Sequence, residues 1–416
     1  MNDDTKKETQ EQIEFRQYCR DWLTANTPPM PTFRMPKSAI EIMTQEQIDY
    51  TRAWQKSAYD AGLVGCDYPK EVGGGGRENC QLIANSEMYR AKTPLMPSPI
   101  GLGIAAPTLF IHGTEQLKQR LLPKLFSGEE IWCQGFSEPG TGSDLASVQT
   151  FAERQGDKWI VNGHKIWTTS AHYATWMILL ARTDKTKKHD GLTYFVAPIK
   201  DALGNGVTVR PLIKMSGETG FNEVIFENLE IDDSYRLDEV GAGWKVAMTT
   251  LTHERGAGIF HRPDSGGQPI LGEEVKRKDA NREHALISLA KKVTRNGKPA
   301  IEDPILLDKI MQQVIRTTGI QAHRKIRKVK DLIDNPQRFA LQDKLIGTEY
   351  VQAMSALALE IAGPKSTLYV GDENAPDVGK WPMSYLNSFG GTIAGGTSEI
   401  QKNIIAERVL GLPKTK

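Results

Sequence analysis

Residues 158–170 read KWIVNGHKIWTTS, and this stretch decides how the middle of the chain folds. Alternating residue types in Trp159–Val161 and again in Lys165–Thr168 predict two strands. Asn162-Gly163 between them is typical of the two-residue turn of a β-hairpin. Further short β-type runs, separated by turn residues, are Trp176–Ala181, Thr193–Pro198, Val207–Leu212 and Glu223–Ile231. The pattern predicts a small β-barrel or sandwich.

Helical patterns flank this β region on both sides. Helical periodicity precedes it at Glu11–Leu23 and Gln45–Ala61, and follows it at Ile305–Leu332 and Asp343–Ile361. We therefore expect an α+β protein with three domains: an N-terminal α-helical domain (1–130), a middle β domain (131–235) and a C-terminal helical bundle (236–416).

Composition narrows the class of protein. The 416 residues carry 52 basic and 51 acidic side chains, a formal net charge of +1, so no overall field attracts nucleic acid or an acidic membrane surface. Hydrophobic residues make up 39%, and no apolar run is long enough to span a bilayer, so we expect a globular protein without nucleic-acid or membrane partners. Four cysteines without Cys-x-x-Cys spacing and a polar start favour the cytoplasm, and no metal site is assigned.

Residues 134–144, QGFSEPGTGSD, form a loop rich in glycine and hydroxyl groups just before the β stretch. Backbone N–H groups and short polar side chains in such a loop can bind a ligand. Glu138 lies in the Glu-Pro-Gly turn, where we expect its carboxylate mainly to fix the loop. The sequence therefore predicts a binding loop next to the first strands.

Residues 395–413, GGTSEIQKNIIAERVLGLP, combine a glycine turn with an amphipathic helix. Gly395 and Gly396 permit positive φ and close backbone approach, and Thr397 or Ser398 can cap the helix that follows. The free N–H groups at the start of this helix suit a polar or anionic ligand. Taken alone, the same pattern is typical of an ordinary capped helix.

Together, in order and spacing, these three segments resemble the acyl-CoA dehydrogenase family, across nearly the whole chain. The resemblance implies the acyl-CoA dehydrogenase fold, an FAD cofactor and an acyl-CoA substrate. The reaction it implies is oxidation to the trans-2-enoyl-CoA, by removal of the α-proton and transfer of the β-hydride to the flavin. Carried over onto this sequence, it implies cofactor-binding residues Gln134, Phe136, Ser137, Trp167, Thr169, Thr397 and Glu399, and substrate-binding residues Ser143 and Arg255.

The resemblance offers two positions for the catalytic base. One directly precedes the Gly-Thr of the tail; here it is Gly395, which cannot accept a proton. The other, as in isovaleryl-CoA dehydrogenase, is a glutamate before an arginine on the first helix of the C-terminal domain. Residues 251–256, LTHERG, place Glu254 there, so Glu254 is the expected base. By itself, a glutamate beside Arg255 is also typical of a surface ion pair, and His253 is more typical of a structural histidine.

Departures from the family leave the partners open. The Arg-x-x-Phe-Gly motif, whose arginine reaches the FAD of a neighbouring subunit, is absent, and residues 261–303 contain a turn-rich insertion. These features are similar to bacterial members that act on bulky or branched acyl groups, some of them heterotetramers. The resemblance implies a homo- or hetero-oligomer, a dimer or tetramer, that passes electrons to an electron-transfer flavoprotein. Two alternatives remain: an acyl-CoA oxidase that uses oxygen, and a non-catalytic partner subunit of a heteromeric acyl-CoA dehydrogenase.

Overall fold

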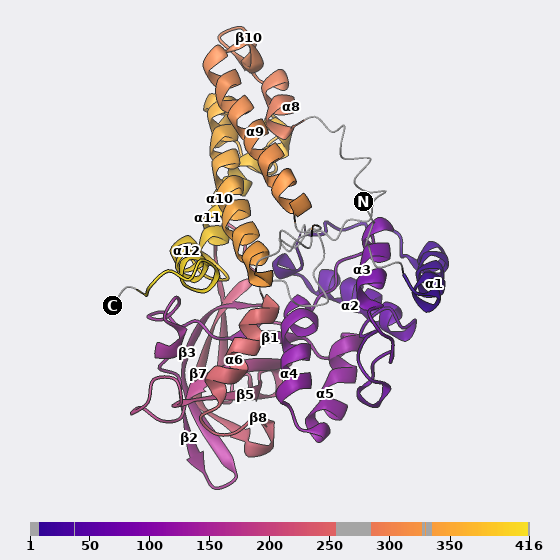
Figure 1. Ribbon diagram of the computed structural model, residues 1–416, viewed down its shortest axis with the longest axis vertical. Coiled ribbons are helices and arrows are strands. Elements are labelled where there is room, and N and C mark those ends of the chain that lie inside the picture. The colour runs from indigo at the N-terminus through magenta and orange to yellow at the C-terminus, as the bar shows by residue number, and fades with distance from the viewer. Residues whose placement is uncertain (1–7, 37, 255–283, 327–328, 330–334, 415–416) are drawn as a thin grey trace. The chain divides into compact units, whose positions relative to one another are not determined.

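The structure is a computed structural model that describes residues 8–36, 38–254, 284–326, 329 and 335–414 (Figure 1). These residues form two compact units. The first contains the described residues up to Ile213 and those from Glu218 to Glu254, and the second contains Lys214–Gly217 and the described residues from His284 onward. Each unit has its own buried hydrophobic core.

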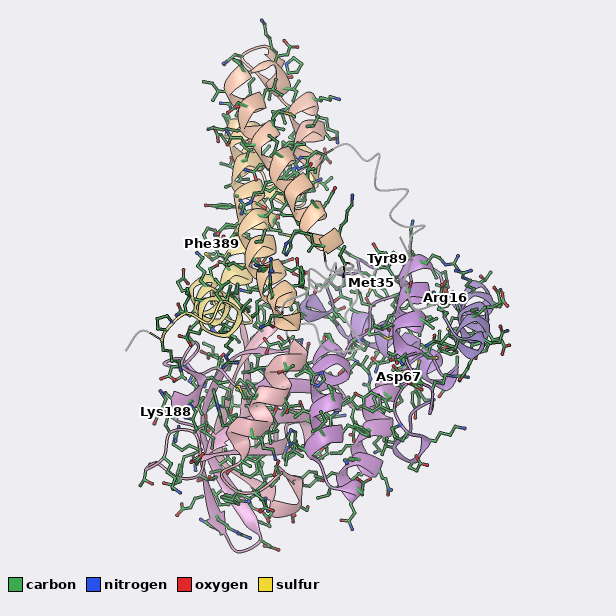
Figure 2. All side chains as sticks on the ribbon, in the orientation of Figure 1. Arg16, Met35, Asp67, Tyr89, Lys188 and Phe389 are labelled. Carbon is green, nitrogen blue, oxygen red and sulfur yellow. The ribbon has the colours of Figure 1, made fainter. Side chains whose placement is uncertain are left out.

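The first unit begins with helices. They are α1 (Gln10–Asn26), α2 (Gln45–Asp60), α3 (Gln81–Arg90), α4 (Ala106–His112) and α5 (Glu115–Ser127). α1 and α2 each start with a capping box, built on Thr9 and Thr44. Asp67, labelled in Figure 2, accepts hydrogen bonds from the backbone N–H groups of Cys80 and Gln81 at the start of α3. These caps satisfy N–H groups that a helix leaves free, and the predicted helical start of the chain is confirmed.

One hydrogen-bonded sheet of eight strands follows the helices. Its strands are β1 (Trp132–Gly135), β2 (Phe151–Gln155), β3 (Lys158–Thr169), β4 (Trp176–Arg182), β5 (Leu192–Pro198), β6 (Val207–Leu212), β7 (Phe221–Asp232) and β8 (Arg236–Leu237). The spatial order is β6-β7-β3-β2-β4-β5-β8, and β1 pairs in parallel with β4. This sheet confirms the predicted middle β region.

Both faces of the central strands are buried. Along β4, Ile178 and Leu180 pack into the core shared with the N-terminal helices, whereas Met177 and Leu179 pack into the core on the opposite face. This alternation follows from the two-residue period of a strand. Helix α6 (Gly243–Thr252) packs on β4 and β5 and against α4 (Figure 1). The end of α6 is thereby held next to the sheet.

The predicted Asn162-Gly163 hairpin is wrong. Residues 158–169 form one strand, β3, which pairs with β2 on one side and β7 on the other. The Asn162 side chain accepts a hydrogen bond from the backbone N–H of Asn228 on β7, at 2.9 Å, instead of stabilising a turn. Gly163 allows close packing, since a Cβ there would lie 2.4 Å from Thr150 Oγ1. Pairing along the whole strand outweighs the local turn preference.

The second unit is a helical bundle, which confirms the predicted C-terminal bundle. Its elements are α8 (Ala285–Lys292), β9 (Thr294–Arg295), β10 (Lys298–Pro299), α9 (Pro304–Ile326), α10 (Pro336–Ala362), α11 (Lys380–Ile393) and α12 (Ser398–Ile404). Leu289, Ile310, Ile361 and Trp381 are among the side chains of its core. No helix in the described part of the chain combines the length and the apolar character needed to cross a membrane.

Candidate active site

The proposed base lies beside the first strand of the sheet. Glu254 lies two residues beyond Thr252, the last residue of α6, and Gln134 is on β1. The Gln134 amide donates a long hydrogen bond to the Glu254 carboxylate, with Nε2 and Oε2 3.5 Å apart. The structure therefore brings together two of the predicted site residues that are 120 positions apart in the sequence. Gln134 thus contacts the proposed base, and the sequence did not predict this contact.

A buried chain of hydroxyl groups holds α6 in place. Tyr194 on β5 hydrogen-bonds Thr250 on α6 at 2.9 Å, and Thr250 hydrogen-bonds Thr108 on α4 at 3.0 Å. Burial raises the pKa of Tyr194, and the negative charge of Glu254 raises it further, against the hydrogen bond to Thr250. The Phe136 ring meets Tyr194 edge-on, with centroids 5.9 Å apart. Glu254 is thus carried by a helix fastened to both the sheet and an N-terminal helix.

The loop after β1 runs alongside β3. The backbone N–H of Ile166 donates to the carbonyl oxygen of Ser137 at 2.9 Å. Lys165 Nζ donates to the carbonyl oxygen of Phe136 at 3.0 Å. Phe136 and Ser137 are therefore held next to the end of β3 that carries Trp167, as a shared binding surface requires.

Trp167 is presented by an irregularity in β3. Between the pairs Lys165–Val224 and Thr168–Asn222 the strand carries one extra residue relative to β7. Trp167 has a positive φ of 61°, and 57% of its surface is exposed. Irregularities of this kind re-aim side chains, and strained backbone in a non-glycine residue is concentrated at functional sites. The exposed indole of Trp167, two residues before the buried Thr169, offers a flat aromatic surface that suits a planar cofactor.

Ser143 lies in the exposed part of the loop after β1. The next residue, Asp144, accepts hydrogen bonds from Ser147 Oγ at 2.6 Å and from the ammonium of Lys188 at 2.9 Å. Hydrogen bonds from Ser147 and Lys188 lower the pKa of Asp144. Ser143 is therefore next to an anchored carboxylate. Arg255 lies outside the described residues.

The predicted tail residues belong to the second unit. Thr397 caps α12, and its hydroxyl accepts a hydrogen bond from the backbone N–H of Ile400 at 3.2 Å. Gly395 and Gly396 have φ values of 64° and 93°, so the predicted glycine turn and helix start are confirmed. Glu399 is in the first turn, where hydrogen bonds from its own backbone N–H and from the Thr397 hydroxyl lower its pKa.

The sequence reasoning missed Lys165. Its side chain is fully buried on β3, and its Nζ is 2.8 Å from Oε1 of Glu138. Glu138 also accepts hydrogen bonds from the backbone N–H groups of Gln149 and Thr150, at 2.6 and 2.8 Å. The expectation that Glu138 fixes its loop is confirmed, and Lys165 is its partner.

Comparison with known proteins identifies relatives along the whole chain. Residues 9–129, 133–233 and 280–410 match the N-terminal, middle and C-terminal domains of acyl-CoA dehydrogenases. The acyl-CoA dehydrogenase IpdE1 of Mycolicibacterium smegmatis is 36% identical over 416 residues, and IpdE1 of Mycobacterium tuberculosis is 34% identical over 405; each alignment covers 96% of this chain and 98% of the relative. The ChsE4–ChsE5 complex from Mycobacterium tuberculosis contains a chain of similar structure, with a TM-score of 0.71, 25% identity and coverage of 99% and 100%.

Proposed function

The chain belongs to the acyl-CoA dehydrogenase family and is an oxidoreductase acting on acyl-CoA, and on that premise we propose that Glu254 is its catalytic base. The observation that carries this proposal is the contact between Glu254 and Gln134 at the junction of α6 and β1. A carboxylate that accepts a hydrogen bond from a neighbouring amide is held in one orientation, as proton abstraction requires. The other position at which the family places a base, in the tail, is occupied here by Gly395, which cannot accept a proton.

Members of the family are FAD-dependent flavoproteins, so FAD is the cofactor of this chain. The residues fit this group, because Trp167 presents an exposed aromatic ring on a strained stretch of β3. We propose that Gln134, Phe136, Ser137, Trp167 and Thr169 bind FAD. The family resemblance also implies Thr397 and Glu399 as cofactor-binding residues. When bound, FAD supplies the acceptor for the β-hydride.

In the proposed reaction the residues of the chain handle the proton. Glu254 takes the proton from the α-carbon of the acyl-CoA, and the electron pair of that C–H bond becomes part of the new double bond as the β-hydride leaves. The product is the trans-2-enoyl-CoA, and Glu254 is left protonated. Gln134 keeps the carboxylate oriented, and Ser143 and Arg255 are the proposed contacts of the thioester substrate.

We also propose an electron acceptor, a class of acyl group and a form of assembly for this protein. We infer that electrons pass to an electron-transfer flavoprotein, as the family resemblance implies, rather than to oxygen as in an oxidase. A bulky or branched acyl group fits the His253-Glu254-Arg255 motif. A heteromeric assembly is supported by the similarity to a chain of the ChsE4–ChsE5 complex. Gly395 motivates the alternative of a non-catalytic partner subunit, and Glu254 speaks against it. Four buried free cysteines fit a cytoplasmic location.

The test is the reduction of bound flavin under anaerobic conditions. We expect straight, branched and steroid-ring acyl-CoA thioesters to differ in how fast they bleach the flavin band, and the Glu254→Gln variant to keep its flavin and lose about 10²–10⁴-fold in reduction rate. The Glu153→Gln variant, altered at an exposed glutamate of β2, serves as the matched control. A Glu254→Gln variant that reduces at the parental rate would remove Glu254 from its role. Reoxidation by oxygen or by an electron-transfer flavoprotein distinguishes oxidase from dehydrogenase.

A further inference from the structure

An ion pair lies in the interior between the loop after β1 and the strand β3. The Lys165 side chain is 0% exposed and that of Glu138 is 7% exposed, with Nζ and Oε1 2.8 Å apart. Lys165 also donates to the carbonyl oxygen of Phe136, at 3.0 Å. One ammonium group therefore bonds both the backbone and a side chain of the same loop.

Glu138 closes the loop at its far end. Its Oε1 accepts from the backbone N–H of Thr150 at 2.8 Å, and its Oε2 accepts from that of Gln149 at 2.6 Å. Glu138 and Thr141 also exchange two backbone hydrogen bonds of 2.9 Å, which form a tight turn. The start and the end of the 136–150 loop are thus tied to one carboxylate, and that carboxylate is tied to β3.

A buried ion pair of this kind contributes little net stability, because desolvation of the two charges offsets their attraction. Burial lowers the pKa of Lys165 to about 8, although the Glu138 carboxylate opposes the change. Burial also acts to raise the pKa of Glu138, but Lys165 and the two backbone hydrogen bonds outweigh it and lower that pKa. The two side chains, 2.8 Å apart, form a buried ion pair in an interior where apolar side chains of similar volume would often be as stable. The geometric constraint on the loop is what distinguishes the ion pair from such a replacement.

We propose that Lys165 and Glu138 are positioning residues that hold the 136–150 loop in the conformation that binds FAD. The inference rests on the proposed function, which places Phe136 and Ser137 of this loop against the flavin. Neither charged group needs to touch the cofactor. Their effect is transmitted through the Phe136 carbonyl oxygen and through the two backbone N–H groups that Glu138 accepts from.

The experiment measures FAD affinity and stability together. The dissociation constant of FAD from the apoprotein is measured by flavin fluorescence, and the melting temperature by circular dichroism, for Lys165→Met, Glu138→Gln and the double variant. We expect each single variant to bind FAD at least 10-fold more weakly, with a shifted flavin absorption band. The double variant should regain melting temperature, since no charge is left unpaired, yet keep the weak FAD binding.

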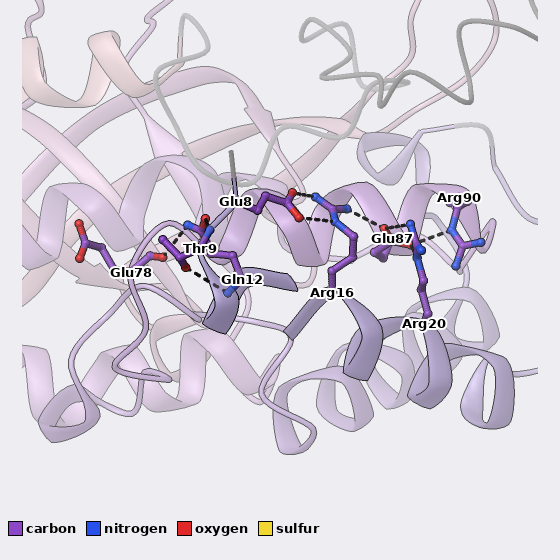
Figure 3. A network of polar contacts seen from close by, with 8 residues as sticks. All are labelled: Glu8, Thr9, Gln12, Arg16, Arg20, Glu78, Glu87 and Arg90. Atoms are coloured by element: carbon purple, nitrogen blue, oxygen red, sulfur yellow. Dashed lines mark hydrogen bonds and ion pairs between the residues drawn. The ribbon is translucent and has the colours of Figure 1, made fainter. Parts of the chain in front are cut away.

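The Glu87 cluster provides the matched control (Figure 3). The Glu87 side chain is 2% exposed and is bonded by Arg16, Arg20 and Arg90 among the N-terminal helices, at 2.6, 3.1 and 2.7 Å. Glu87→Gln removes an equally buried, paired carboxylate. It should lower the melting temperature while the FAD dissociation constant stays within two-fold of the parental value.

The outcomes separate this inference from the proposed function. If the parental protein binds FAD and the single variants match its dissociation constant and spectrum, the positioning role is overturned. It is also overturned if the double variant regains both stability and affinity, because the ion pair would then be structural only. If the parental apoprotein takes up no FAD, the proposed cofactor site itself fails. Glu138→Gln keeps the shape of the side chain and one acceptor oxygen. If Lys165→Met does not fold, the FAD dissociation constant of Glu138→Gln therefore decides the test.

Discussion

Replacing Gln134 by leucine tests the link between β1 and the proposed base. Leucine has a similar volume and cannot donate a hydrogen bond, so the change removes the Nε2 to Oε2 contact of 3.5 Å. A hydrogen bond to a carboxylate favours its ionised form. Without that bond, a higher pH is needed before Glu254 can accept the α-proton. The expected effect is therefore on the acid limb of the pH–rate profile.

The length of the contact sets the size of the effect. Hydrogen bonds to charged groups contribute roughly 1.5–3 kcal/mol, and one at the long limit contributes less, about 1 kcal/mol. Since one pH unit corresponds to about 1.36 kcal/mol, the acid limb should move up by about 0.7 pH units. On that limb the rate of flavin reduction should fall about five-fold. Well above the limb it should change little, because Glu254 is ionised in both proteins.

The assay is anaerobic stopped-flow reduction of bound flavin by one acyl-CoA across the pH range. Gln134→Glu serves as a second arm: it places another carboxylate next to Glu254, and like charges should raise the acid limb by more than one unit. Superimposable acid limbs for the parental protein and Gln134→Leu would refute the argument. An acid limb of Gln134→Glu at lower pH than that of Gln134→Leu would also refute it, because repulsion between the two carboxylates can only move the limb to higher pH.

Two further predictions concern stability. Gly163→Ala should lower the melting temperature, at a cost of about 1–3 kcal/mol, because the new Cβ would lie 2.6 Å from the Thr150 Cα; an unchanged melting curve would contradict the packing. Burial acts to raise the pKa of Glu87, but its arginines outweigh it and lower that pKa, so Glu87 stabilises the fold above its unfolded pKa and loses this effect as the pH falls. The melting temperatures of the parental protein and Glu87→Gln should therefore converge from pH 6 to pH 3, and a constant gap would exclude this linkage.

Local signals predicted the tail and the domain types well. The cap at Thr397 follows from a hydroxyl residue after two glycines and before an apolar helix, and all the interactions involved lie within a few residues. The pairing of Gln134 with Glu254 could not be predicted in this way. It depends on α6 packing on β5, which is fixed by buried contacts such as Tyr194 with Thr250. The family resemblance gave both residues, but not their contact.

Two residues of β3 differ in how far the sequence predicts them: the burial of Lys165 could have been predicted, whereas the exposure of Trp167 could not. If residues 158–169 are treated as one strand, simple alternation places Lys165 on the same inward face as Trp159 and Val161, as the structure has it. Dividing the stretch at Asn162-Gly163 concealed that pattern. Continued alternation would also turn Trp167 inward, yet the extra residue on β3 turns it out to 57% exposure. No glycine marks this irregularity in the sequence. The positive φ of Trp167 lies between stretches of β3 that pair with β7 on either side, so tertiary structure sets the exposure of the residue that we propose to meet the cofactor.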